Sequence, residues 1–221
     1  MKIKWIHLFL KSKIPFYIYR LSKGDSVILK RYKKHSLNII VLYGTVYVLK
    51  IFTNNEASLL AILSDDTIID SATDYLDSDY TYSRLIALQP TYLLSFSWTD
   101  FISRPSNSSV LAVELIGLFR NTIRHYQISS SILVHKEIKN RVVQLLLFMC
   151  QEFAIIQNLR FIIPFKMSQL TISHMIGGNQ VTVSKIMSHL TKKFLVKYTP
   201  KKKILVQYLE LLKYLYDNGM G

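Results

Sequence analysis

The spacing of apolar residues divides the chain into a part with short alternating runs and a part with helical periods. From residue 15 to residue 96, β-branched and aromatic residues form short runs separated by turn sequences such as Lys23-Gly24-Asp25 and Tyr43-Gly44. Short strands at close spacing predict a β-sandwich or a small barrel. The clearest strands are expected at residues 26–30, 37–42, 45–52, 58–63 and 92–96.

A long helix is expected after a breaker segment at residues 103–109, which contains Pro105. From residue 110 to 134 apolar residues recur at helical spacing, interrupted only by Gly117. At about 1.5 Å per residue, such a helix spans about 40 Å. Because this is too long to pack only on a small domain, we expect an exposed stripe that forms a coiled-coil-like dimer seam. The alternative is a helix packed along its own domain. The apolar positions are Leu111, Leu115, Leu118, Phe119, Ile123, Tyr126 and Ile132.

A helix-turn-helix is predicted at residues 168–189, after a helix at 136–153 and a short strand at 161–163 that ends at Pro164. Ser168 is suited to cap a first helix of about eight residues. Gly177 stands where that helix would end in a left-handed conformation, and Asn179 is suited to cap the second helix. The alternative is an ordinary helical hairpin. Contacts between the two helices are expected from Ser173, where small size permits close approach, and from Ile172, Ile176, Val183 and Ile186.

A β-wing is predicted directly after the second helix. Residues 191–198 are expected to form a strand, residues 199–203 a basic turn and residues 204–207 a second strand. Lysines at the tip of a wing are suited to phosphate contacts, which position a protein on DNA without specifying sequence. A solvated turn is the alternative interpretation of such a run. The three lysines are Lys201, Lys202 and Lys203.

The second helix of a helix-turn-helix enters the major groove, so its early outward residues are the candidates for reading bases. Gln180 is suited to adenine, Lys185 to guanine and Val181 to a thymine methyl group. Thr182 and Ser184 are expected at phosphate or base. Ser188 and His189 are expected at the DNA backbone. The full predicted set is Ser168, Gln169, Gly177, Asn179, Gln180, Val181, Thr182, Ser184, Lys185, Ser188 and His189.

The net charge of +14 agrees with a polyanionic partner, either nucleic acid or an anionic membrane surface. Residues 136–221 hold 13 lysines and arginines against four acids, so the basic excess is concentrated around the predicted DNA-binding segment. Charge alone is also compatible with a protein that binds no acidic partner specifically.

Several other functions are disfavoured by what the sequence lacks. No apolar run is long enough for a membrane-spanning helix, and Lys11 and Lys13 interrupt the only candidate for a signal-peptide core. The lone Cys150 is expected to be buried and structural, which weakly indicates a reducing compartment. No phosphate loop, nucleophile elbow or convincing carboxylate pair supports an enzyme, and the six histidines show no metal-ligand spacing. Two rivals remain: a cyclic-nucleotide-binding signalling module, and an RNA or membrane-surface binder that uses charge alone.

Four segments together resemble a known family: Lys23-Gly24-Asp25, residues 41–47, residues 141–153 and residues 170–190. This is the family of the catabolite activator protein and the FNR regulators, and within it the sequence most resembles the cyanobacterial global nitrogen regulator, NtcA. The resemblance implies an α+β fold: a β-roll sensor like a cyclic-nucleotide-binding jelly roll, a long dimerisation helix and a winged helix-turn-helix. The expected domain ranges are 1–105, 106–135 and 136–221.

The resemblance also implies a function and a location. It implies a homodimer that binds a near-palindromic site in double-stranded DNA, recruits RNA polymerase and activates nitrogen-controlled genes, with no membrane partner. A ligand-responsive regulator unrelated to nitrogen and an effector-independent DNA binder are the alternatives. The enriched Ile, Lys, Asn and Tyr are encoded by AT-rich codons. With this bias the chain looks like a plastid-encoded algal form; otherwise we expect the bacterial cytoplasm.

The sequence departs from the family at both sites. Gln180 and Lys185 stand where the family usually has arginine, so its operator preference does not carry over. The sensor segment at residues 67–72 lacks the family's Gly-Glu turn, and six aspartates lie in and around it. No cofactor is expected to be required. If the family effector 2-oxoglutarate binds, Arg84 and Arg124 are the candidate partners of its carboxylates. The cysteines of an iron–sulfur centre are absent.

Overall fold

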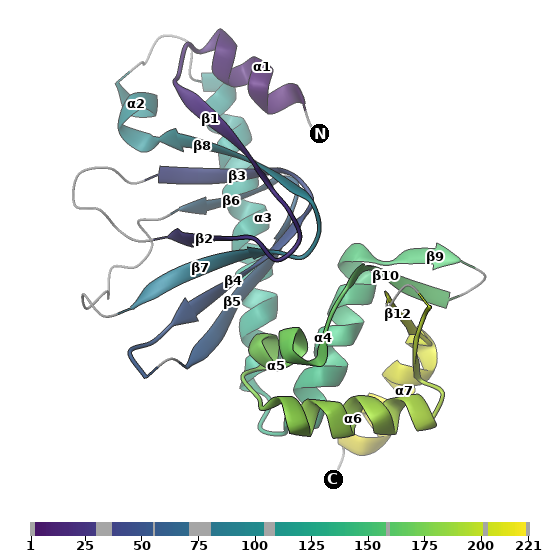
Figure 1. Cartoon of the computed structure of the whole chain (residues 1–221). Helices are drawn as coiled ribbons and strands as arrows, with labels where there is room; N and C mark the ends of the chain where they lie inside the picture. Colours follow the sequence, from purple (N-terminus) through teal and green to yellow (C-terminus); the bar gives the residue numbers. More distant parts are fainter. Residues whose placement is uncertain are drawn as a thin grey trace. The chain divides into compact units, whose positions relative to one another are not determined.

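The computed structural model divides the chain into two compact units, Met1–Ser129 and Ser130–Gly221. It describes residues 3–29, 37–54, 56–70, 81–103, 109–157, 160–200 and 203–219. The helix α3 (Ser109–Val134) is one continuous helix, and most of it belongs to the first unit (Figure 1). The helical spacing at residues 110–134 therefore predicted this helix correctly.

The first unit is a β-roll made of two antiparallel four-stranded sheets, in the orders β1-β8-β3-β6 and β2-β7-β4-β5. All five strands predicted from sequence are present. The missed elements of this unit are short helices, an edge strand and strands with few consecutive apolar residues. The elements before α3 are α1 (Ile3–Lys11), β1 (Phe16–Leu21), β2 (Ser26–Leu29), β3 (Leu37–Tyr43), β4 (Thr45–Ile51), β5 (Ala57–Ser64), β6 (Thr67–Asp70), β7 (Tyr82–Ala87), β8 (Thr91–Ser97) and α2 (Trp98–Ile102).

Both faces of the first sheet are covered, because alternate residues of a strand point to opposite sides. On one side Val41 and Leu93 pack against the second sheet, where Val48 and Leu85 face them. On the other side Leu42 and Phe96 pack with residues of α1 and α3. The α3 side chains in this cluster are Leu111, Leu115 and Leu118. One apolar row of α3 therefore packs along its own unit, as the alternative interpretation had it.

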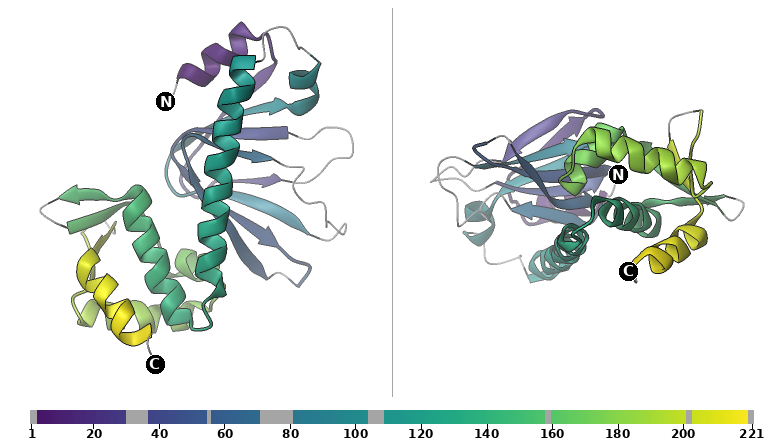
Figure 2. Two further views of the ribbon diagram at one scale, coloured as in Figure 1. Left: turned by 180° about the vertical axis from the view of Figure 1, so that it is seen from behind. Right: turned by 90° about the horizontal axis from the view of Figure 1, so that it is seen from below.

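The second unit combines helices with a four-stranded antiparallel sheet of order β11-β12-β10-β9 (Figures 1 and 2). Helix α4 lies at its centre and contacts α5, α6, α7 and β10. Cys150 lies in α4 and is 3% exposed, and burial raises the pKa of its thiol to about 12. The elements after α3 are α4 (Ile138–Phe153), β9 (Ile155–Gln157), β10 (Arg160–Lys166), α5 (Gln169–Ile176), α6 (Gln180–Lys192), β11 (Val196–Tyr198), β12 (Lys203–Val206) and α7 (Tyr208–Gly219).

Two expectations about this unit were wrong in detail, and one helix was missed. Pro164 does not end its strand: β10 continues to Lys166, because the pairing register shifts between Ile163 and Lys166 and spares the proline from a ladder position. The first wing strand does not begin at residue 191, since α6 continues to Lys192 and β11 starts only at Val196. The terminal helix α7 was not predicted.

Candidate nucleic-acid interface

Side-chain caps begin both helices of the helix-turn-helix, as predicted. The Ser168 hydroxyl accepts a hydrogen bond from Thr171 N–H at 3.0 Å, which starts α5. The Asn179 Oδ1 accepts one from Thr182 N–H at 2.8 Å, which starts α6. Each cap satisfies one of the N–H groups that the first helical turn leaves without a partner. The first residue of α6, Gln180, is thereby held at a defined helix start.

The turn between the helices depends on Gly177, which has φ +63° and ψ +40°. Only glycine adopts this left-handed conformation without a steric cost from a Cβ atom. The N–H groups of Gly177 and Gly178 both bond to Ser173 O and so close the end of α5. Arg141 of α4 adds a further bond, with Nη1 donating to Ile176 O at 3.1 Å.

Arg141 also fixes the segment that precedes α4, because its Nε donates to His135 O at 2.7 Å. A single guanidinium therefore holds the chain after α3 and the last turn of α5 at fixed distances from α4. Sequence reasoning did not assign this role. Arg141 was noticed only as part of a family-like segment, and its two carbonyl acceptors lie 6 and 35 residues away.

The contact between the two helices is apolar and close. Ser173 is 2% exposed, and its hydroxyl donates to Leu170 O within α5, so the small side chain is buried as predicted. Ile172, Ile176 and Val183 are fully buried. Ile186 was predicted at this contact but is only half-buried. Met187 is buried instead, because positions 183, 187 and 190 share one side of the helix.

The opposite side of α6 is open. The side chains of Gln180, Val181, Lys185, Ser188 and His189 are exposed, while those of Thr182 and Ser184 are half-buried. The first turn holds no acid. A helix N-terminus carries partial positive charge, so this end of α6 favours a polyanion. The helix thus presents amide, aliphatic and cationic groups together, which is the donor and methyl-contact set that base edges in the major groove require.

A basic cluster lies at the other end of α6, around Tyr214 of α7. Lys193 Nζ lies 4.8 Å and Lys139 Nζ lies 4.9 Å from the centre of the Tyr214 ring. The His189 ring centre is 6.4 Å from it. Cation–π attraction of this kind draws α4, α6 and α7 together. Sequence reasoning missed this cluster because it missed α7.

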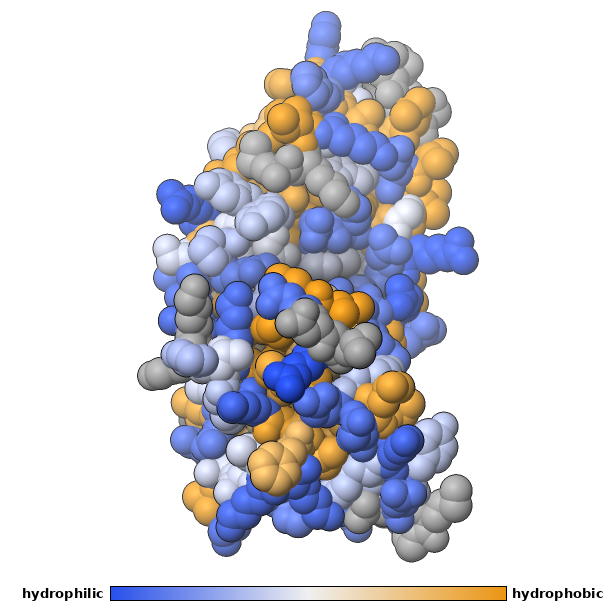
Figure 3. All heavy atoms as spheres, turned by 90° about the vertical axis from the view of Figure 1, so that its right-hand side faces the viewer, coloured by the Kyte–Doolittle hydropathy of each residue, from blue (hydrophilic) through white to orange (hydrophobic). Residues whose placement is uncertain are grey.

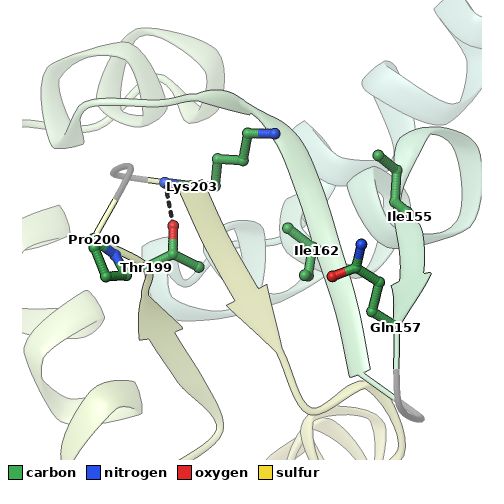
Figure 4. Close-up of a pocket in the computed structure, with 6 residues that line it drawn as sticks. All are labelled: Ile155, Gln157, Ile162, Thr199, Pro200 and Lys203. Atoms are coloured by element: carbon green, nitrogen blue, oxygen red, sulfur yellow. Dashed lines mark hydrogen bonds between the residues drawn. The ribbon is translucent and has the colours of Figure 1, made fainter.

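The wing is the hairpin of β11 and β12. Its turn is closed by Thr199 N–H donating to Lys203 O at 2.8 Å and by Lys203 N–H donating to Thr199 Oγ1 at 3.0 Å (Figure 4). Lys203 also lines a surface pocket of about 300 Å³ with Ile155 and Ile162 (Figure 4). Of the three wing lysines, Lys201 and Lys202 lie outside the described residues. Their contact with phosphate stays a prediction, as does that of Lys203.

The two arginines predicted to bind an effector are exposed and belong to different elements. In β7, Leu85 and Ala87 face the core between the sheets, so Arg84 points to the opposite face of its sheet. There its Nε donates to Ser26 Oγ at 3.1 Å. Burial raises the pKa of the nearby Tyr47, and the Arg84 charge offsets part of that increase. Arg124 lies on the exposed side of α3. Effector binding by either arginine stays a prediction.

Thr122 and Gln127 of α3 stand where the resemblance to the global nitrogen regulator implies effector-binding residues, and Thr122 is engaged within the unit. Thr122 is 7% exposed. Its hydroxyl donates to Ile68 O at 2.8 Å and accepts from Ile68 N–H at 2.9 Å. The hydroxyl has a single proton to donate, and it already donates this proton to a hydrogen bond with β6. Gln127, the second such position, is exposed.

A second row of α3 residues is apolar and exposed. Val113 is 68% exposed, Ile116 66% and Ile123 55%. Successive members of this row are three and seven residues apart, which is the spacing of a helix seam. Gly117 leaves room for close approach, because even a Cβ atom at this position would meet nothing within 4 Å. The row is distinct from the one that packs on the β-roll.

Metal-binding and membrane-spanning features are both missing from the described ranges. No group of three or more histidine, cysteine, aspartate or glutamate side chains is arranged there to hold a metal ion. None of the helices in those ranges has both the length and the hydropathy to cross a membrane.

Comparison with known proteins identifies sequence relatives of this chain. No family model matches the chain. The chain is 25% identical over 217 residues to the HTH-type transcriptional regulator ycf28 of Porphyra purpurea, which covers 97% of this chain and 88% of that protein. It is 26% identical over 197 residues to the global nitrogen regulator of Synechococcus elongatus, covering 86% of each.

The fold has close counterparts among solved structures. A CRP-family transcriptional regulator from Thermus thermophilus superimposes with a TM-score of 0.69 at 14% identity, covering 88% of this chain and 95% of that one. The order of β-roll, long helix and winged helix-turn-helix, together with the relatives that match along nearly the whole chain, gives one conclusion. Over most of its length the chain is similar in sequence to ycf28 and to a global nitrogen regulator, and its fold is that of the CRP/FNR transcription regulators.

Proposed function

We propose that the protein is a sequence-specific DNA-binding transcription regulator that acts as a homodimer on a near-palindromic promoter site. The observation that carries this proposal is the open side of α6. Its N-terminus is fixed by Asn179, and it exposes Gln180, Val181 and Lys185 without an acid in the first turn. Base-edge contacts by these side chains would supply specificity. Contacts by Lys203 and its neighbours would supply phosphate binding.

Dimerisation through α3 is part of the proposal. Val113, Ile116 and Ile123 form an apolar row on the outside of the helix. Exposed apolar rows of this kind are stabilised when a second helix covers them. Two copies joined in this way would present two recognition helices to half-sites about one turn of DNA apart. A near-palindromic operator follows from that two-fold symmetry.

The regulated genes are proposed to be nitrogen-controlled, and the protein is proposed to activate them by recruiting RNA polymerase. Similarity to the global nitrogen regulator of Synechococcus elongatus supports the first part. The composition bias and the similarity to a Porphyra purpurea protein support a plastid location. The bacterial cytoplasm is the alternative.

Regulation without an effector is the second candidate, and two observations favour it. The Thr122 hydroxyl already binds both backbone groups of Ile68, and Arg84 points to the side of its sheet that faces away from the inter-sheet core. Binding of 2-oxoglutarate would therefore need other groups or a rearrangement of α3. We propose that the DNA-binding activity persists in the absence of 2-oxoglutarate.

Selection from a library of duplex DNA tests the function. The purified chain is incubated with randomised duplexes of about three helical turns at fixed physiological salt, with and without 2-oxoglutarate, and the bound DNA is sequenced. Enrichment of one two-fold-symmetric site in both conditions is expected. Enrichment only with 2-oxoglutarate would reject effector independence and restore the metabolite as the regulator. No enrichment in either condition would mean that the charge supports only nonspecific binding, and the proposed function would be wrong.

A further inference from the structure

Phe194, which follows α6, combines two unfavourable features. Its φ is +58°, in the left-handed region where the Cβ atom of any residue other than glycine meets a steric cost. Its ring is 85% exposed. The conformation itself closes the helix, since Phe194 N–H bonds to Thr191 O and Leu195 N–H bonds to Leu190 O. Glycine would close the helix equally well. Contacts within the unit therefore do not account for a phenylalanine here.

The ring forms one wall of a groove of about 320 Å³ between the end of α6 and the sheet. Leu205 and Val196 contribute apolar surface to it. Arg160 and Lys197, both exposed, supply two positive charges, and none of the described residues that line the groove is acidic. Figure 3 views the molecule from the side where β9 and β10 lie and shows hydrophobic surface open among hydrophilic side chains. The groove thus offers an aromatic wall, an apolar floor and a cationic rim.

We propose that this groove binds an acidic peptide segment of a partner protein, with one large apolar side chain of the peptide against Phe194. The cationic rim selects carboxylates by charge complementarity. The apolar floor and ring favour a buried anchor residue, which is the usual source of affinity at protein interfaces. DNA fits less well, because phosphates would use Arg160 and Lys197 but would leave the Phe194 ring in water. Phe194 also lies 14 residues beyond Gln180, about 20 Å along the helix direction from the base-reading end.

Selection from a displayed library of short random peptides tests the proposal with the full-length chain. Peptides that combine one large apolar residue with two or more acids are expected to be enriched. Fluorescence anisotropy then measures the affinity of a labelled, enriched peptide. Phe194→Gly is expected to weaken binding about tenfold or more. Arg160→Gln combined with Lys197→Gln should weaken it by a similar factor that shrinks at high salt. Leu209→Ala, which truncates another exposed apolar side chain of the same unit, is the matched control and should leave affinity unchanged.

Phe194→Gly keeps the left-handed turn, and Phe194→Asn provides a second variant that tolerates the same φ. Circular dichroism verifies that both fold. Absence of acidic–apolar enrichment, or equal peptide affinity for wild type and both Phe194 variants, would overturn the proposal. Duplex DNA affinity is expected to be unchanged in both variants. A loss of duplex affinity would instead assign the ring to the DNA interface and would also overturn the peptide groove, whatever the outcome for base reading by α6.

Discussion

The helix-turn-helix and the β-roll differ in how their candidate functional residues are held. In the helix-turn-helix, Ser168 and Asn179 bond to N–H groups three residues ahead, so each cap lies within a few residues of what it positions. In the β-roll, Thr122 bonds to Ile68, 54 residues away, and Arg84 to Ser26, 58 residues away. The first region is organised by local rules and the second by the packing of distant segments.

The two regions also differ in whether their candidate side chains are free of contacts within the fold. On the open side of α6, Gln180, Val181 and Lys185 take no part in the buried contacts of the helix, which come from Val183, Met187 and Leu190. Gln180 and Lys185 are therefore available to a ligand. The hydroxyl of Thr122, by contrast, is already used to attach α3 to β6. The candidate DNA-reading side chains of α6 are thus open to a ligand, whereas Thr122 of the first unit serves the fold.

The largest effect is expected on dimerisation through α3. Dimerisation would give the first unit a function that needs no ligand pocket. Val113→Asp combined with Ile116→Asp places charges in the exposed apolar row. Loss of the dimer is expected, with roughly a hundredfold weaker binding to a two-half-site operator, because the second half-site no longer benefits from a linked partner. Sedimentation velocity and operator titration measure the two quantities.

Ile28→Asp is the matched control for that experiment. It introduces one carboxylate at a side chain that is 61% exposed on β2, away from α3 in the sequence. The control should remain dimeric. A dimeric double variant with unchanged operator affinity would show that this row of α3 is not the seam.

An intermediate effect tests whether Thr122 serves the fold. Thr122→Val leaves the buried N–H and C=O of Ile68 without their side-chain partner, and about 1–3 kcal/mol of unfolding free energy should be lost. Thr122→Ser keeps the hydroxyl and should lose only about 1 kcal/mol, for the missing methyl group. Urea unfolding measures both. Full stability in the valine variant, together with a lost response to 2-oxoglutarate, would break the comparison by making Thr122 an effector ligand.

A smaller effect is expected in the helix-turn-helix. Asn179→Ala removes the oxygen that caps α6 and should lower the unfolding free energy by about 1 kcal/mol. Asn179→Asp retains an acceptor at the same place and should restore it. Chemical denaturation followed by circular dichroism compares the three proteins. An alanine variant as stable as wild type would mean that the cap contributes nothing to the start of α6.

The sequence predicted those features that follow from short-range chemistry. The caps, the left-handed Gly177 and the period of α3 were found because each depends on residues within one or two helical turns. The predicted start of the wing at residue 191 was wrong, since Thr191 and Lys192 suit a helix end as well as a strand. The pairing of Arg141 with Ile176 O and the cluster around Tyr214 could not be found, because they depend on how helices cross. The side of the sheet to which a strand arginine such as Arg84 points depends likewise on strand register. A register shift of one residue moves each side chain to the opposite face of the sheet.

In the proposed function, α6 reads DNA sequence through Gln180 and Lys185. The most direct measurement is the ratio of affinities for the selected operator and for random duplex, at one physiological salt concentration. Wild type is compared with Gln180→Ala combined with Lys185→Ala, and with Lys213→Ala as a control that removes an exposed lysine from α7. The ratio should fall by roughly tenfold or more in the double variant, since each base contact contributes about 1–3 kcal/mol of discrimination. The ratio should be unchanged in the Lys213→Ala control. An unchanged ratio in the double variant would contradict the account, because the specificity would then lie elsewhere.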